Sequence, residues 1–188
     1  MKSVDIDRHI RELQNTVVAA TINYQIWWIY KSADTRPKYI DTMNRYLGFF
    51  HVSIHAHFVA YIIALYRFYE QNRRTINLTS LLKALPALNK NSLPADFSTR
   101  TEKARDIWKK VAIIRNNCFG HINGVNDTSE MFAMARLRPD DIKYLLDITK
   151  SIINDISESW NGSIHAFDLD ARKDTIDLLD DLNSYVIR

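Results

Sequence analysis

The sequence predicts an all-α protein, a helical bundle with two long antiparallel helices and additional shorter helices. The chain of 188 residues holds only 4 Gly and 4 Pro, fewer than a protein built from many tight turns would need. Apolar residues recur at three- and four-residue spacing over long stretches, which is typical of amphipathic helices. Because 46% of the residues are hydrophobic, the chain can bury the core of one compact domain. We therefore expect a single domain over residues 1–188, in which 161–188 forms a C-terminal helical extension.

The helices can be placed from their apolar periodicity and from the signals at their ends. A polar segment that ends at Pro37 interrupts the first helical pattern, and Pro37 suits the first turn of a long second helix. Pro86 should end a short helix, and the proline and two acids that follow Arg138 suit the first turn of another. Loops are expected at 87–97 and 123–130. The expected helices cover residues 4–30, 38–70, 80–85, 98–118, 138–160 and 173–186.

The most apolar stretch of the chain is 49–66. Three histidines and a serine interrupt it, and Arg45 and Arg67 flank it, so we interpret it as a core helix rather than a membrane span. The first ten residues have acids where a secretory signal has its basic and apolar regions. The single cysteine, Cys118, excludes an internal disulfide and suits a reducing compartment. We expect a cytoplasmic protein with no membrane partner.

Positive charge is concentrated in the middle of the chain. Residues 65–115 carry 11 Lys/Arg against 4 Asp/Glu, whereas residues 116–188 carry 7 against 13. Such a basic segment favours contact with phosphates, although a single charge run can equally be a solvated helix face.

One segment, IIRNNCFGHIN, places Arg115 six positions before His121. On one continuous helix the two side chains would lie roughly 120° apart in azimuth and about 9 Å apart along the axis. Either Gly120 ends the helix and lets His121 turn back, or a second copy across a two-fold axis completes the cleft. A permanent guanidinium suits phosphate oxygens, and an imidazole that titrates near neutral pH can transfer protons. These are the groups that RNA cleavage without a metal requires.

The segment resembles the HEPN superfamily, in which Arg, a polar residue and a following His stand at the end of a helix in an all-α bundle. The order AYIIALYRFYE, then NLTSLL, then the helix entering Arg115 and a proline-started helix is similar to the AbiU-type abortive-infection branch, over roughly residues 45–160. The resemblance implies a HEPN-like bundle and a homodimeric, metal-independent endoribonuclease that uses no cofactor. It also implies RNA as substrate and an antitoxin or regulatory protein as a further partner. The implied catalytic residues are Arg115, Asn116 and His121.

Other interpretations of the same residues stay open. Some HEPN proteins bind RNA, nucleotides or proteins without cutting, so a non-catalytic binding dimer is the alternative. His51 and His55 have a spacing that can bind zinc, but no third ligand is evident, and we expect no metal site. Cys118 continues an apolar stripe, so a buried thiol is favoured over a nucleophile. The residues that we expect to contact RNA are Arg67, Tyr69, Lys109 and Lys110.

Overall fold

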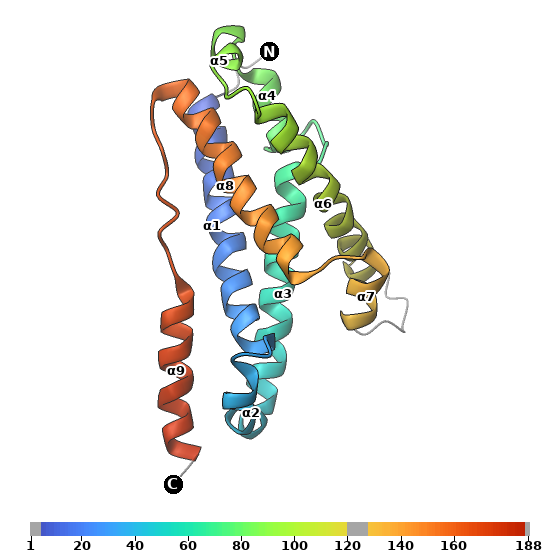
Figure 1. The fold of residues 1–188 in the computed structure, drawn as a ribbon, viewed down its shortest axis with the longest axis vertical. Coiled ribbons are helices and arrows are strands. Elements are labelled where there is room, and N and C mark those ends of the chain that lie inside the picture. Colours follow the sequence, from blue (N-terminus) through green and yellow to red (C-terminus); the bar gives the residue numbers. More distant parts are fainter. Residues whose placement is uncertain (1–4, 120–127, 187–188) are drawn as a thin grey trace. The chain divides into compact units, whose positions relative to one another are not determined.

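The computed structural model describes residues 5–119 and 128–186, and within these ranges it contains nine helices and no strand. The all-α prediction is therefore confirmed (Figure 1). The chain divides into two compact units, Met1–Val17 with Ile62–Phe167 and Val18–Tyr61 with Asp168–Arg188. The helices are α1 (Ile6–Lys31), α2 (Arg36–Arg45), α3 (Leu47–Tyr69), α4 (Leu78–Ala84), α5 (Ala87–Asn91), α6 (Phe97–Phe119), α7 (Thr128–Ala135), α8 (Pro139–Asn161) and α9 (Ala171–Val186).

In the first unit, α6 and α8 pack side by side and run antiparallel (Figure 1). Near the start of α6, Arg100 Nη2 lies 2.6 Å from a carboxylate oxygen of Asp155, late in α8. Further along α6, Lys110 Nζ lies 3.2 Å from Asp141 at the start of α8. The two ion pairs match opposite ends of the helices, so α6 is held in a defined register on α8.

The core of this unit is built from one apolar stripe of each helix, as expected for amphipathic helices. Helix α8 begins with Pro139 in its first turn and ends at Asn161. It is capped by Gly162, whose φ of 74° is the left-handed conformation that glycine adopts readily. Its predicted bounds, 138–160, are close to those observed. Fully buried side chains of the core include Leu65, Leu81, Val111, Ile114, Leu145 and Ile152.

In the second unit, α9 packs against α2. Tyr39 donates a hydrogen bond to Asp180 (2.9 Å), and Thr42 donates one to Asn183 (2.7 Å). Hydrogen bonds from Lys38 and from Tyr39 hold the pKa of Asp180 below its ordinary value. The predicted C-terminal helix therefore contributes to the core of this unit. That core is the cluster Ile29, Tyr30, Tyr39, Met43, Phe50 and Leu179.

Three local predictions were wrong. The helix expected over 38–70 is two helices, because Tyr46 leaves the helical conformation (φ −109°, ψ 40°) shortly before Gly48, a residue that costs about 1 kcal/mol in a helix interior. The loop expected at 87–97 contains α5, since Pro86 both stops α4 and starts the next helix with its fixed φ of −60°. The loop expected at 123–130 overlaps the start of α7 at Thr128.

Helix α3 is only partly a core helix. Phe58 and Tyr61 are buried, but Phe49 and Val52 are 60% and 66% exposed. Within the described ranges, α3 is the one helix long and apolar enough to cross a membrane, a test that core helices of soluble proteins also pass. Only 22% of its most apolar stretch is buried, so the expected core helix over 49–66 is packed in the core along only part of its length.

Candidate functional site

Arg115 stands on the accessible side of α6, near the end of that helix. The preceding residue, Ile114, is fully buried in the core, whereas Asn116 and Asn117 are exposed. Arg115 itself is half-buried. The helix thus presents the guanidinium at the surface of the unit rather than inside the bundle.

An aromatic pair, Tyr66 and Trp108, supports this guanidinium. Arg115 Cζ lies 4.7 Å from the centroid of the Tyr66 ring, a cation–π distance. The Trp108 ring lies 5.8 Å from the Tyr66 ring, and Trp108 Nε1 donates to the Tyr66 carbonyl at 3.1 Å. Because one face of the guanidinium rests on Tyr66, its position is restricted before any ligand arrives. We call Tyr66 and Trp108 the aromatic platform.

Asn116 is tied directly to Arg115. Arg115 Nη1 donates to Asn116 Oδ1 at 3.1 Å, which occupies one of the five donors that a guanidinium carries. Asn116 can therefore orient the guanidinium, and its own amide N–H groups are still able to donate. The adjacent Asn117 is used differently, since its Nδ2 donates to the Ile113 carbonyl at 2.8 Å within the helix.

His121, the third residue of the expected site, lies outside the described residues, as does the side chain of Cys118. The structure therefore brings together Arg115 and Asn116. A juxtaposition of Arg115 with His121 stays a prediction from the sequence.

The expected RNA-contacting cations have different surroundings. Arg67 is exposed, and among the described residues it has no acidic partner. Lys109 pairs with Asp106 (2.8 Å) on the surface, an interaction worth under about 1 kcal/mol. Lys110 pairs with the shielded Asp141. Burial alone would raise the pKa of Asp141, but hydrogen bonds from Arg138 and Lys110 lower it, so Lys110 serves the α6–α8 packing.

Tyr69 is a core residue, which corrects its expected contact with RNA. Its side chain is 0% exposed, and its hydroxyl shares a hydrogen bond of 2.7 Å with the Thr149 hydroxyl. Burial raises the pKa of the Tyr69 hydroxyl. A ring enclosed in this way offers no face to a base. The nearby aromatic residue that is only half-buried and contacts Arg115 is Tyr66. Helical spacing alone cannot distinguish such a residue from a core residue.

The histidines of α3 also differ from one another. His51 and His55 are exposed, whereas His57 is half-buried and its Nδ1 lies 2.8 Å from Asn23 Oδ1. Within the described parts of the chain, no group of three His, Cys, Asp or Glu side chains is arranged to hold a metal ion.

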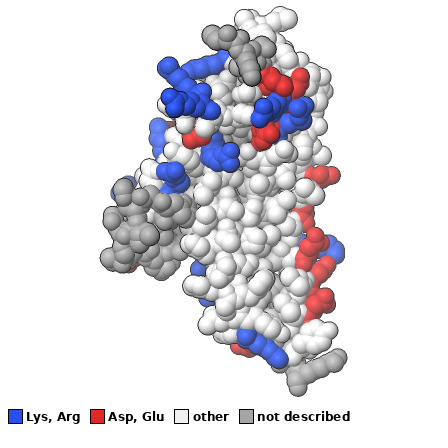
Figure 2. Space-filling view, turned by 180° about the vertical axis from the view of Figure 1, so that it is seen from behind, with Lys and Arg blue, Asp and Glu red and all other residues white. Residues whose placement is uncertain are grey.

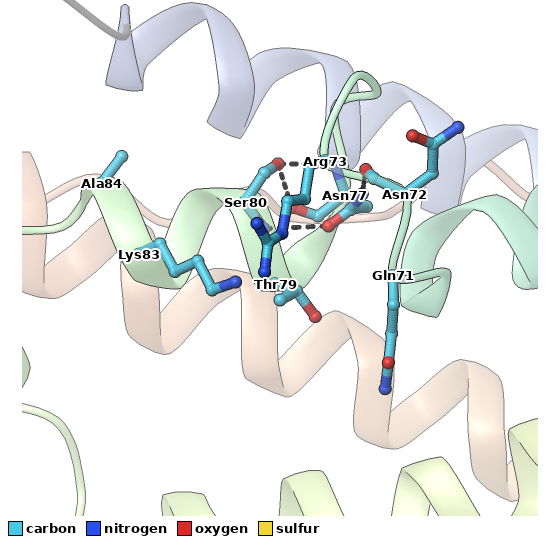
Figure 3. A pocket seen from close by; sticks show the side chains of 8 residues that line it. All are labelled: Gln71, Asn72, Arg73, Asn77, Thr79, Ser80, Lys83 and Ala84. Carbon is cyan, nitrogen blue, oxygen red and sulfur yellow. Dashed lines mark hydrogen bonds between the residues drawn. The ribbon is translucent and has the colours of Figure 1, made fainter.

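A hollow of about 610 Å³, lined mainly by residues with polar or charged side chains, lies where α3 is linked to α4. The sequence patterns described above did not indicate it. Figure 3 shows Arg73 and Lys83 pointing toward the same space beside Thr79. The wall behind them is built by the cap of α4, in which Asn77 Oδ1 accepts from the Ser80 N–H at 2.8 Å. The available signal was the segment 71–95, which has four Lys/Arg and no Asp or Glu.

The all-α fold and an Arg-Asn pair presented at the end of a long helix define a HEPN-like domain. The family model described as AbiU2 matches residues 3–180, so the chain belongs to the AbiU2 family of HEPN domains, which is linked to abortive infection. The match extends well beyond residues 45–160, which carried the resemblance in the sequence. Comparison with curated proteins and with solved structures found no match.

Proposed function

We propose that this chain is a metal-independent endoribonuclease of a defence or toxin system, acting in the cytoplasm as a homodimer. The observation that carries the proposal is Arg115, which is held on the aromatic platform at the surface of α6 and belongs to the RNNCFGH segment. An antitoxin or regulatory protein would control such an activity.

The proposed reaction is attack of a ribose 2′-OH on the adjacent phosphate. A proton leaves the 2′-OH, negative charge builds up on the five-coordinate phosphorus, and the departing 5′-oxygen is protonated. The products therefore carry 2′,3′-cyclic phosphate and 5′-hydroxyl ends. The Arg115 guanidinium can pair with the phosphate oxygens as charge accumulates, which is worth several kcal/mol when donors are preorganised.

His121 supplies the proton transfers, since an imidazole can accept and donate protons near neutral pH. Asn116 positions the Arg115 guanidinium through the hydrogen bond described above. Two copies across a dyad can divide the roles of acid and base between two His121 side chains.

The exposed face of α3 supports association with a second copy. Between residues 46 and 66 the chain has no Lys, Arg, Asp or Glu, and Phe49 and Val52 project into solvent. Gly48 and Ala56 follow the same helical stripe, so large and small side chains alternate along it. An uncharged face of this kind can meet its own copy without repulsion, and exposed apolar patches mark interaction sites.

The test is cleavage of total cellular RNA and of a defined oligoribonucleotide by purified protein, with and without EDTA. We expect cleavage in both conditions, cyclic phosphate ends, and a loss of at least about 100-fold in rate for Arg115→Ala. The matched control is Arg11→Ala, which removes an exposed helical arginine of the same unit and should retain full activity.

Two results would overturn the proposal. Wild-type protein that binds RNA with salt-sensitive affinity but leaves it intact in every condition would indicate the binding module instead. If the activity disappears with EDTA and returns with a divalent metal, the reaction depends on a metal ion and not on the proposed Arg–His chemistry.

A further inference from the structure

The hollow beside α4 is lined by two cationic side chains, Arg73 and Lys83. Within the described residues, Arg73 and Lys83 have neither an ion pair nor a side-chain hydrogen bond. Both are exposed and converge on the space next to Thr79 (Figure 3). Two like charges that share a hollow repel one another unless an anion lies between them, so the site favours a negatively charged ligand.

The groups that hold the hollow in shape are not these cations. Asn77 is 1% exposed and donates through Nδ2 to the carbonyl oxygens of Asn72 (2.8 Å) and Thr75 (3.2 Å). Its Oδ1 accepts from the Ser80 N–H, and the Ser80 hydroxyl accepts from the Asn77 N–H at 3.0 Å. The wall is therefore rigid without Arg73 and Lys83, whose charges are available to a ligand.

The hollow is connected to Arg115 through side chains of the same unit. Thr79 Oγ1, on the wall, accepts from Arg105 Nη2 at 3.0 Å. Arg105 lies on α6, ten residues before Arg115, which is about 15 Å along the helix axis. Trp108 of the aromatic platform lies between them in the chain. On the face seen in Figure 2, most Lys and Arg side chains gather in the upper half.

We propose that this hollow is a phosphate subsite, in which Arg73 and Lys83 hold the backbone of the RNA strand a few nucleotides from the phosphate at Arg115. Arg105, which contacts the wall of the hollow through Thr79, lies about 15 Å along α6 from Arg115, a separation that a strand of a few nucleotides can span. The phosphate is recognised by charge, so the subsite extends the grip on the strand without reading its bases. This inference rests on the proposed function, because it takes RNA as the ligand.

The test measures the binding of a fluorescent RNA 12-mer whose 2′-hydroxyls are all methylated, so that it cannot be cleaved. The double variant Arg73→Gln/Lys83→Gln should weaken binding about 10- to 30-fold near 0.1 M salt and should reduce the slope of log K against log salt by about 1.4, as for two lost single-strand contacts. The matched control Arg8→Gln/Arg11→Gln removes the same charge elsewhere in the unit and should change the dissociation constant less than about twofold. Equal thermal unfolding of both variants checks the fold.

The outcomes separate this inference from the proposed function. Unchanged affinity and salt slope in the Arg73/Lys83 variant, with tight binding by wild type, would overturn the subsite and leave the nuclease proposal standing. No binding and no cleavage by wild type would overturn the nuclease proposal itself. Adenosine monophosphate that competes as strongly as the 12-mer would assign the hollow to a free nucleotide, which overturns the role in holding a strand.

Discussion

The guanidinium carbon of Arg115 lies 4.7 Å from the centre of the Tyr66 ring. This contact places the charge of the expected site on a surface that is itself fixed, because Trp108 holds the Tyr66 backbone through its indole N–H. An arginine side chain loses about 2 kcal/mol of rotamer freedom when it is immobilised. Stacking on Tyr66 restricts that freedom in the free protein, so less is lost when a phosphate binds.

The first prediction concerns this stacking. Replacing Tyr66 by Leu removes the aromatic face, which contributes about 1 kcal/mol to the placement of Arg115, and we expect kcat/KM for RNA cleavage to fall about 5- to 10-fold. Tyr66→Phe keeps the ring and should retain activity within about twofold. Equal loss in both variants would show that the hydroxyl, not the ring face, is what the site needs.

For Tyr69 we expect an effect on stability and none on RNA binding. Tyr69→Phe removes the buried hydrogen bond to Thr149 and should lower the free energy of unfolding by about 1 kcal/mol, measured by urea denaturation. Affinity for uncleavable RNA should be unchanged, because the ring is enclosed. A weaker affinity at unchanged stability would mean that Tyr69 reaches the ligand after all.

The apolar face of α3 leads to a prediction about assembly. Val52→Asp places a charge in the proposed interface and should convert the dimer to a monomer in light scattering, with a dissociation constant raised at least about 100-fold. Leu88→Asp, at a residue that is 82% exposed on α5, is the matched control and should leave the dimer intact. Wild-type protein that is monomeric but binds lipid vesicles through this face would assign the surface to a membrane instead.

The stability of the fold should depend on pH through His57. Burial lowers the pKa of His57, so below about pH 6.5, the ordinary value of the imidazole, the unfolded chain binds the proton more readily. The contribution of neutral His57 is complete above that pH and is lost as the pH falls through the folded-state pKa. His57→Gln, which can still bond to Asn23, should reduce the drop in thermal unfolding temperature between pH 7.5 and 5. His55→Gln, at an exposed position, should reproduce the wild-type drop.

The helices were predictable where apolar periodicity and end signals agree. Helices α1 and α8 illustrate this, since proline, acids and glycine mark the ends of α8 and the core stripe fills its length. The kink at Tyr46 was not predictable, because it depends on a single backbone conformation in a segment whose apolar pattern continues. The sequence also predicted that α3 is apolar, but its periodicity does not indicate which residues of α3 another helix covers.

The residue types of the candidate site were predictable from the sequence, but the side chains that support them were not. Arg115 and Asn116 could be selected because their chemistry suits phosphate. The platform depends on contacts between residues far apart in the chain, such as Tyr66 and Trp108, although the seven-residue spacing of Trp108 and Arg115 places both on one helix face. The hollow depends on Asn77, and the role of Asn77 as a helix cap was predictable from the sequence. The open volume beside Arg73 and Lys83 was not predictable.

The cap of α4 has a consequence for how this scaffold can diversify. Uncharged groups of Asn77 and Ser80 maintain the local architecture, whereas the side chains of Arg73 and Lys83 form no hydrogen bond or ion pair with any residue that the structure describes. Exchanges at positions 73 and 83 should therefore change how tightly the proposed subsite holds a phosphate, at little cost in folding free energy. In the proposed defence role, the strength with which a strand is held can then change while the scaffold stays constant.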